Sequence, residues 1–240
     1  MSSTNPPAPE DDRPLTFEVL TAPVDKTDAL NLVADSIAQE RQVASRSLIF
    51  NPLCLSVAVA VISVVHFSTE SIRTDVTSML TTYSGLVLAY LLAIRYATSA
   101  YIRIAEETDW PNWLYGSDSE PADNVVLGAR YGTEIIATVI LRLHRVKKTK
   151  DNGKATIRAW TTNLRYRRRG LGGDMLREAV KTAKQTLGRN CTVEFAADHA
   201  NSAMPLPSMF NGPVIARQKR ATNALSVAMK EWEAGESSQH

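Results

Sequence analysis

The residues with the clearest chemical potential form one arginine- and glycine-rich run, residues 167–174 (Arg-Arg-Arg-Gly-Leu-Gly-Gly-Asp). The run stands between a predicted strand over 155–162 and a predicted helix over 173–187, which makes it a strand-to-helix turn. Glycines let backbone approach a ligand closely, and the free N–H groups of a helix's first turn attract anions. Arginines add charge-assisted hydrogen bonds. The run is therefore predicted to hold a pyrophosphate.

The spacing within this turn argues against two other phosphate-binding turns. No Gly-Lys-Ser/Thr follows, as a P-loop requires, and no third glycine stands at the spacing of a dinucleotide-binding turn. The alternative interpretation is an arginine-rich surface turn that touches membrane phosphates or nucleic acid.

Charge is distributed unevenly along the 240 residues. Residues 130–240 hold 20 of the 27 Lys and Arg residues but only 9 of the 25 Asp and Glu residues, so this part carries +11 and the rest −9. A basic half of this kind suits a phosphorylated cofactor, an anionic lipid surface or nucleic acid. The two cysteines, Cys54 and Cys191, belong to no Cys/His cluster, so neither a disulfide scaffold nor a metal site is predicted.

Two apolar stretches predict a membrane hairpin. Residues 48–67 contain no Asp, Glu, Lys or Arg, and about 20 such residues suffice for a helix to cross the hydrocarbon core. A second, less apolar stretch covers 79–94 and continues to 102, with Arg95 placed to snorkel towards headgroups. Only residues 68–78 separate the two, which favours an antiparallel pair. The alternative is a buried helix or strand pair of a soluble core.

The basic residues that flank the hairpin predict its orientation. Arg41, Arg46, Arg95 and Arg103 lie outside the hairpin, whereas Arg73 lies in its connection. Cytoplasmic flanks are enriched in Lys and Arg. We therefore expect a multi-pass membrane protein with two spans and both termini in the cytosol, and the endoplasmic reticulum is the candidate organelle.

Periodicity and turn residues divide the rest of the chain into alternating elements. Residues 1–14 read as a disordered tail without a secretory signal, and a helix with Thr27-Asp28 as N-caps precedes the hairpin. The other expected strands cover 15–22, 125–129, 135–143 and 192–197, and the other expected helices cover 103–113 and 215–232. The predicted division is a tail over 1–14, a first strand and helix over 15–47, the hairpin over 48–102, the remainder of the same domain over 103–233, and a tail over 234–240.

The spacing Arg167-x-x-Gly170-x-Gly172 resembles the acetyl-CoA signature of the GNAT acyltransferase superfamily, and the chain looks most like its membrane-bound camello-like, cysteine-conjugate N-acetyltransferases. Further similar segments are Phe17–Gln42, Leu48–Tyr101, Glu134–Val139 and Asn201–Leu206. The resemblance covers about residues 17 to 210. It implies an α/β fold with a GNAT-like mixed sheet flanked by helices and an inserted two-helix transmembrane hairpin.

The resemblance also implies an activity, namely transfer of an acetyl group from acetyl-CoA, a co-substrate, to a small-molecule or peptide amine. Membrane lipids are expected partners, and neither nucleic acid nor a metal is expected. The implied cofactor-binding residues are Trp160, Thr161, Thr162, Arg167, Arg168, Arg169, Gly170, Leu171, Gly172 and Gly173. Candidates for the base that deprotonates the amine are Glu134, Asp198 and His199, each of which is otherwise an ordinary surface or strand-end residue.

The chain departs from the family pattern near its end. Where relatives carry a tyrosine that protonates the departing thiolate, this chain has Pro207, and the residues after Gly212-Pro213 read as helix instead of the usual closing strands. Two alternatives to an active enzyme therefore stay open. One is a catalytically silent GNAT-like module that binds acyl-CoA or a partner protein. The other is a membrane hairpin protein whose basic face, including 145–150 and 217–220, adheres to anionic lipid.

Overall fold

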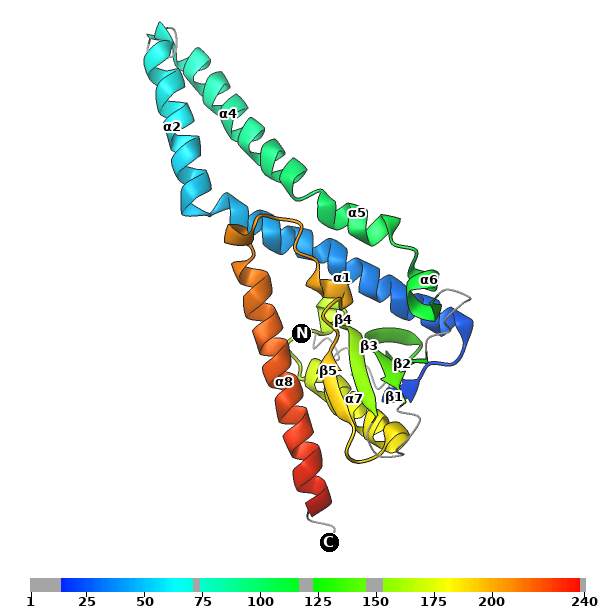
Figure 1. Ribbon diagram of the computed structural model, residues 1–240. Coiled ribbons are helices and arrows are strands. Elements are labelled where there is room, and N and C mark those ends of the chain that lie inside the picture. The colour runs from blue at the N-terminus through cyan, green and yellow to red at the C-terminus, as the bar shows by residue number, and fades with distance from the viewer. Residues whose placement is uncertain (1–13, 71–73, 117–122, 146–152, 238–240) are drawn as a thin grey trace, which may run out of the picture. The chain divides into compact units, whose positions relative to one another are not determined.

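The structure is a computed structural model that describes residues 14–70, 74–116, 123–145 and 153–237 (Figure 1). Its strands are β1 (Leu15–Val19), β2 (Asn124–Tyr131), β3 (Glu134–His144), β4 (Lys154–Thr162) and β5 (Thr192–Phe195). Its helices are α1 (Pro23–Ile49), α2 (Pro52–Ser68), α4 (Val76–Ala97), α5 (Ala100–Glu107), α6 (Trp110–Tyr115), α7 (Leu171–Leu187) and α8 (Gly212–Ser237), and its short 3-10 turns are η1 (Leu164–Tyr166), η2 (Ala200–Ser202) and η3 (Ser208–Phe210). The tail predicted over 1–14 lies outside the described residues except for Pro14.

The chain separates into two compact units, which are described one at a time. The first unit contains Met1–Val33, Leu114–Ala196 and Ala224–His240. The second contains Ala34–Trp113 and Ala197–Asn223. Helices α1, α6 and α8 contribute residues to both.

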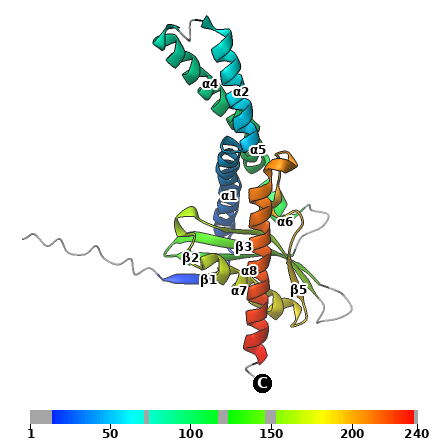
Figure 2. The same ribbon diagram turned by 90° about the vertical axis from the view of Figure 1, so that its left-hand side faces the viewer.

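The first unit is built on a five-stranded sheet with the order β1-β2-β3-β4-β5. Figure 2 shows β1 and β5 at opposite edges. The first four strands pair antiparallel, and β5 pairs parallel with β4. Gly132, at a φ of 63°, occupies the turn between β2 and β3, a backbone conformation that glycine adopts without steric cost. The result is a mixed α/β sheet flanked by helices, as the sequence predicts.

The core of the first unit follows from the alternation of side chains along the strands. Leu127, Val139 and Leu141 point to one face, where they pack with Leu176 and Val180 of α7. The apolar residues of α7 recur every three or four positions, so the helix presents one continuous buried stripe to the sheet. Neighbouring strand residues on the opposite face are buried too, so the sheet is covered on both sides.

The second unit contains an antiparallel pair of helices, α2 and α4, which lie side by side (Figure 1). Asn51 and Asp75 cap the N-termini of α2 and α4 with their side chains. The hydroxyl group of Tyr83 lies 2.7 Å from Nδ1 of His66 on the other helix. Among the described residues, α2 has no buried side chain and α4 has only Ile94.

Length and composition make these helices candidates for membrane spans. The helical run Val76–Glu107 is long and apolar enough to cross a membrane, and only 6% of its most apolar window is buried. Helices α1 and α2 pass the same test only as a pair, bent by 57° at the break between them. At 1.5 Å per residue, α2 is about 25 Å long and α4 about 33 Å long, against a hydrocarbon core of about 30 Å. Membrane insertion stays a prediction.

Several predicted boundaries were wrong. Helix α1 begins at Pro23, a residue suited to the first helical position, and the hydroxyl of Thr27 donates to the carbonyl of Pro23 inside the helix instead of capping it. The helix expected over 103–113 is two helices, α5 and α6, which are separated at Thr108 and Asp109. The tail expected from 234 is helical to Ser237, because α8 continues without a break.

Candidate functional site

The glycine- and arginine-rich turn lies in the first unit, where it links η1 to α7. Its backbone turns sharply because Arg168 and Gly170 both have positive φ angles, 64° and 86°. Gly170 is the N-cap of α7, and its carbonyl accepts the N–H groups of Gly173 and Asp174. The N–H groups of Leu171 and Gly172 precede these first helical hydrogen bonds and lie at the positive end of the helix dipole. This geometry favours an anion at the turn.

The edge of β4 next to this turn changes its pairing partway along the strand. Parallel pairing with β5 covers Lys154 to Ile157 and ends with a hydrogen bond from the N–H of Ala196 to the carbonyl of Ile157. Strand β4 nevertheless continues to Thr162 while still paired with β3. Within the described part of the chain, residues 159–162 therefore extend β4 beyond its pairing with β5.

The direction of the backbone groups along this free edge follows from one hydrogen bond. The N–H of Asn163 donates to the carbonyl of Ile136 on β3. Because neighbouring residues of an antiparallel strand alternate in direction, Trp160 and Thr162 direct their backbone groups away from β3. An extended ligand with amide groups is able to pair with this edge as an additional strand would.

The side chain of Trp160 joins the edge of β4 to the first turn of α7. Its Nε1 donates to the carbonyl of Gly172 at 3.1 Å, and its ring lies 5.9 Å from the ring of Phe195 between centroids. A Cβ atom at Gly172 would lie only 3.1 Å from Cζ2 of Trp160. A glycine at this position therefore lets the start of α7 approach the strand closely.

The three arginines of the turn are exposed, and they differ in their contacts. Nε of Arg167 donates to the carbonyl of Thr162 at 2.8 Å, which holds the turn against the end of β4. The guanidinium of Arg169 lies 5.8 Å from the centroid of the Tyr166 ring, within the range of a cation–π contact. The positive charge thus lies beside the start of α7. The binding roles of residues 160–162 and 167–173 stay predictions.

Only one of the three candidate bases belongs to the unit that contains the turn. Glu134 is the exposed first residue of β3, and its Oε1 lies 3.5 Å from Nδ2 of Asn163, the residue that follows β4. Asp198 and His199 belong to the second unit. Burial lowers the pKa of His199, and the nearby charge of Asp198 partly opposes this shift. His199 is thereby kept neutral to lower pH than an ordinary histidine.

Reasoning from the sequence missed an ion-pair cluster beside the first turn of α7. Arg177 contacts Asp174 at 2.6 Å and Glu231 of α8 at 2.7 Å. Its hydrogen bond is the main cause of the lowered pKa of Glu231. A lone carboxylate at Asp174 would repel a phosphate, and Arg177 offsets that charge. The spacing of Asp174 and Arg177 was readable in the sequence, whereas the partner Glu231 lies 54 positions further on.

Comparison with known proteins gives a family match for part of the chain. Residues 90–205 match the acetyltransferase (GNAT) family. No curated protein matches the chain at a significant level.

Three solved structures are similar to the chain over about half its length. One is an aminoglycoside acetyltransferase from an uncultured soil metagenomic sample, in complex with sisomicin (9% identity, 48% of this chain, 65% of that one, TM-score 0.31). Another aminoglycoside acetyltransferase from an uncultured soil metagenomic sample has 17% identity over 50% of this chain and 72% of that one, with a TM-score of 0.32. A transcriptional regulator from Bacillus halodurans C-125 has 17% identity over 50% of this chain and 66% of that one, with a TM-score of 0.28. The first and third matches span slightly less than two thirds of those chains.

Proposed function

We propose that this chain, whose residues 90–205 match the acetyltransferase (GNAT) family, transfers an acetyl group from acetyl-CoA to an amine while the α2–α4 hairpin anchors it in a membrane. The observation that carries the proposal is the junction of the free β4 edge with the N-terminus of α7 in the first unit. The edge offers backbone donors and acceptors to an extended ligand, and the helix start offers donors to its phosphates. Trp160 holds the two together.

The residues at this junction fit the parts of acetyl-CoA. Its arm contains amide groups, which suit the backbone groups of Trp160 and the N–H of Thr162 on the edge that β5 does not pair with. Its pyrophosphate suits the turn that begins at Arg167 and the first N–H groups of α7. Gly170 has a positive φ, and a Cβ there would meet no atom within 4 Å, so this part of the turn is open to a ligand that approaches the backbone closely.

When bound, acetyl-CoA supplies a thioester carbonyl as the electrophile. The chain's own contribution is to orient that carbonyl along β4 and to donate hydrogen bonds to its oxygen from backbone N–H groups. The N–H groups of Trp160 and Thr162 suit this role because they point away from β3. Fixed donors aimed at a developing negative charge are the largest catalytic term in many acyl transfers. In this proposal, the β4 edge binds acetyl-CoA and also stabilises the negative charge that develops on the carbonyl oxygen.

Proton transfer from the attacking amine is assigned to a side chain of this protein. Glu134 belongs to the same unit as the turn and stands beside the end of β4, so its carboxylate is our first candidate. His199, in the second unit, stays a candidate from the sequence alone; its lowered pKa leaves the imidazole neutral, and so able to accept a proton, at neutral pH. We do not assign Asp198 the role of the base, because its charge acts on His199 by favouring the protonated imidazole.

The departing thiolate requires less help than the amine. Pro207, the N-cap of η3, has no proton to give. A thiol has a pKa of about 8.5, so its thiolate is a tolerable leaving group near neutral pH and water supplies the proton. The absence of a tyrosine at this position is therefore compatible with turnover.

Membrane anchoring is supported by the exposed apolar surface of α2 and α4 and by the length of the run Val76–Glu107. We further propose that the protein is a camello-like enzyme of the endoplasmic-reticulum membrane, with both termini in the cytosol. Glycosylation acceptors inserted next to Glu70 and after Ser237 test the topology in a eukaryotic host. We expect modification only at the first site, and the reverse pattern would overturn the orientation.

The activity is tested with full-length protein in lipid nanodiscs. We expect acetyl-CoA-dependent release of CoA with at least one amine from a panel of cysteine conjugates, aminoglycosides, peptides and polyamines. Glu134→Gln should lower kcat by about 100-fold or more if Glu134 is the general base, with unchanged acetyl-CoA affinity. His199→Gln provides the matched comparison. Absence of CoA release with every amine would contradict the enzymatic part of the proposal.

A second candidate function is a catalytically silent module that binds acyl-CoA or a partner protein. Two observations favour it, namely Pro207 and the helix α8, which occupies the sequence after β5 where the family's closing strands are expected. This candidate predicts saturable acetyl-CoA binding that is unaffected by any amine. Binding without turnover across the panel would favour it over the enzyme.

A further inference from the structure

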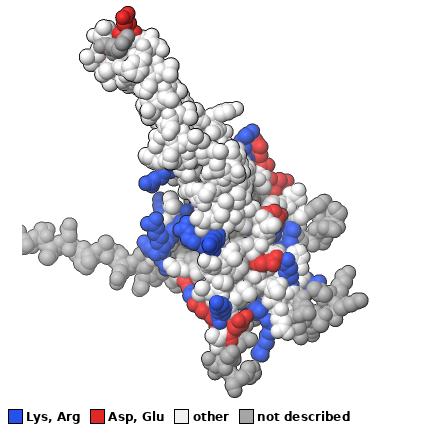
Figure 3. All heavy atoms as spheres, turned by 60° about the vertical axis from the view of Figure 1, so that its left-hand side comes forward, with Lys and Arg blue, Asp and Glu red and all other residues white. Residues whose placement is uncertain are grey.

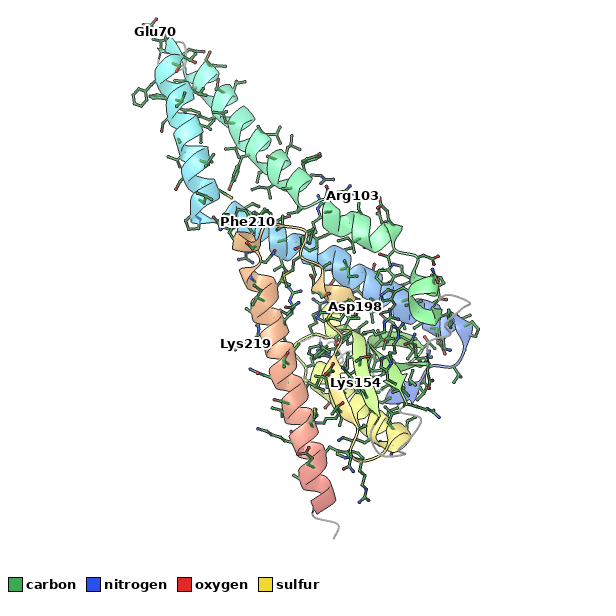
Figure 4. The ribbon with its side chains drawn as sticks, viewed as in Figure 1. Glu70, Arg103, Lys154, Asp198, Phe210 and Lys219 are labelled. Carbon is green, nitrogen blue, oxygen red and sulfur yellow. The ribbon has the colours of Figure 1, made fainter. Side chains whose placement is uncertain are left out.

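The second unit carries a conspicuous surface at the base of the hairpin, where α1 gives way to α2. Residues 204–220, named here the base segment, comprise η3, its flanking loops and the first turns of α8. Phe210 of this segment packs against a buried cluster that includes Leu48, Ile94 and Leu206. Figure 4 places Phe210 at this junction and Glu70 at the far end of the hairpin. The base segment is therefore fixed beside the start of α2.

Polar contacts hold the base segment in place within the second unit. Arg217 contacts the carboxylate of Glu40, a side chain only 6% exposed, at 2.5 Å. Asn201 donates to the same carboxylate at 3.3 Å, and Nδ2 of Asn211 donates to the carbonyl of Leu206. The first turns of α8 are thus anchored to α1, so the side chains that they direct outwards form a defined surface.

That surface is apolar at its start. Met209 is 66% exposed and Ile215 is 53% exposed, although Phe210 and Val214 beside them are packed inwards. Phe50, at the same α1–α2 junction, is also exposed. Exposed large apolar side chains on neighbouring segments favour contact with another apolar phase or molecule.

Basic residues follow immediately along α8. Between Asp198 and Glu231 the chain has no Asp or Glu, whereas Arg217, Lys219 and Arg220 fall in this interval. At 1.5 Å per residue, Lys219 and Arg220 lie about 10 to 12 Å along the helix from its start at Gly212. Both are exposed, and their long side chains can extend back along the helix.

The far end of the hairpin has the opposite character. Glu70 and Asp75 lie there, with Arg73 as the one basic residue of the connecting sequence, and Figure 3 shows acidic atoms at the tip of an otherwise uncharged column. An apolar column with basic residues at its base and acidic residues at its tip matches the charge asymmetry of a cytoplasmic leaflet, whose anionic lipids attract Lys and Arg.

We propose that the base segment is a second, peripheral membrane contact that inserts Met209 and Ile215 at the interface of an anionic leaflet and pairs Lys219 and Arg220 with lipid headgroups. This proposal rests on the proposed membrane insertion of the hairpin and adds to it. Each exposed Lys or Arg near an anionic surface favours binding by about five-fold. The segment would hold the start of α8 at the bilayer surface.

The test uses full-length protein with Cys54→Ala and Cys191→Ala, reconstituted into nanodiscs of neutral phosphatidylcholine or of a phosphatidylcholine and phosphatidylglycerol mixture. An environment-sensitive fluorophore is attached at Met209→Cys, at Leu88→Cys as the hairpin reference, and at Thr222→Cys further along α8. Quenching by lipids with a spin label near the headgroup reports contact at Met209 and Thr222, whereas lipids with a spin label deep on the acyl chain report insertion at Leu88. Lys219→Glu/Arg220→Glu is added to the Met209→Cys protein as the charge variant.

We expect the Met209 label to be quenched more strongly in anionic than in neutral discs, and the Thr222 label to be quenched weakly in both. The double charge variant should lower the docked-to-undocked ratio by more than about ten-fold, because two basic residues are lost and two acidic ones are gained. Quenching at Leu88 without quenching at Met209 would overturn the base segment alone. Absence of quenching at Leu88 would instead contradict membrane insertion, and with it the proposed anchor.

Discussion

The two units differ in how exposed the apolar side chains of their helices are. In the first unit, Leu176 and Val180 of α7 are fully buried against the sheet. In the second, helices α2 and α4 are more apolar still, and all their described residues except Ile94 are exposed or half-buried. A water-soluble helix of that composition would bury one face. This difference in exposure is the observation on which the proposed membrane anchor rests.

The largest effect that we expect comes from two leucines of equal exposure. Leu88 on α4 is 58% exposed and Leu164 in η1 is 59% exposed. Leu88→Asp should disfavour membrane insertion by about 3 kcal/mol, because a carboxylate near the middle of a span is costly. Leu164→Asp should leave insertion unchanged. The membrane-integrated fraction after carbonate extraction measures both, and equal behaviour of the two variants would remove the distinction between the units.

Truncation of the same residue type gives the second comparison. Leu176→Ala should lower the free energy of unfolding of the first unit by about 3 kcal/mol, because it leaves a cavity at a fully buried position. Leu88→Ala removes as many atoms from an exposed position and should change this free energy by less than about 0.5 kcal/mol. Denaturant unfolding in detergent, followed by tryptophan fluorescence, checks both. A large loss at Leu88 would mean that α4 packs into a protein core.

A smaller effect is expected from the hydrogen bond that joins Trp160 to the start of α7 in the first unit. Trp160→Phe keeps an aromatic ring beside Phe195 and removes the N–H that donates to the carbonyl of Gly172. The loss of one such hydrogen bond costs about 1 kcal/mol, which corresponds to acetyl-CoA binding about five-fold weaker if this bond positions the turn. Titration calorimetry measures the Kd. An unchanged Kd would show that the turn is held by other contacts, such as that of Arg167 with Thr162.

The smallest expected effect concerns protonation in the second unit. Burial disfavours the charged imidazolium, so the pKa of His199 should lie below its ordinary value of 6.5. The carboxylate of Asp198 favours the charged form, and Asp198→Asn should therefore lower this pKa further. Titration of the histidine ring signals by NMR, assigned with His199→Gln, measures both values. A midpoint at or above 6.5, or a rise in Asp198→Asn, would contradict this electrostatic description.

The elements of the first unit were predictable because their signals are local. The strand expected over 155–162 spans Lys154–Thr162, and the helix expected over 173–187 spans Leu171–Leu187. The glycines between these two elements, from Gly170 to Gly173, indicated the turn. Boundaries failed where two rules competed, as at Pro23, which starts α1 four residues before the capping residues chosen from the sequence.

The rest depends on tertiary structure that no local pattern encodes. Pairing between β4 and β5 ends at Ile157, where the register of β4 against β3 also shifts, and no local pattern in the sequence marked either feature. The contacts of Arg177 with Glu231 and of Glu40 with Arg217 join residues 54 and 177 positions apart. Reasoning from the sequence therefore placed the glycine- and arginine-rich turn at the start of a helix and missed the contacts that hold its surroundings.

Equilibrium binding of acetyl-CoA to the full-length protein in nanodiscs tests the central claim most directly, with Gly172→Asp and Gly173→Ala as paired variants. Gly172→Asp places a carboxylate where the pyrophosphate is expected and against Trp160, whereas a Cβ at Gly173 meets only the flexible end of Arg177, at 3.8 Å. We predict saturable binding to the wild type, loss of binding in Gly172→Asp and near-normal binding in Gly173→Ala. Absence of saturable binding to the wild type, or binding that Gly172→Asp leaves unchanged, would contradict an acetyl-CoA site at this turn.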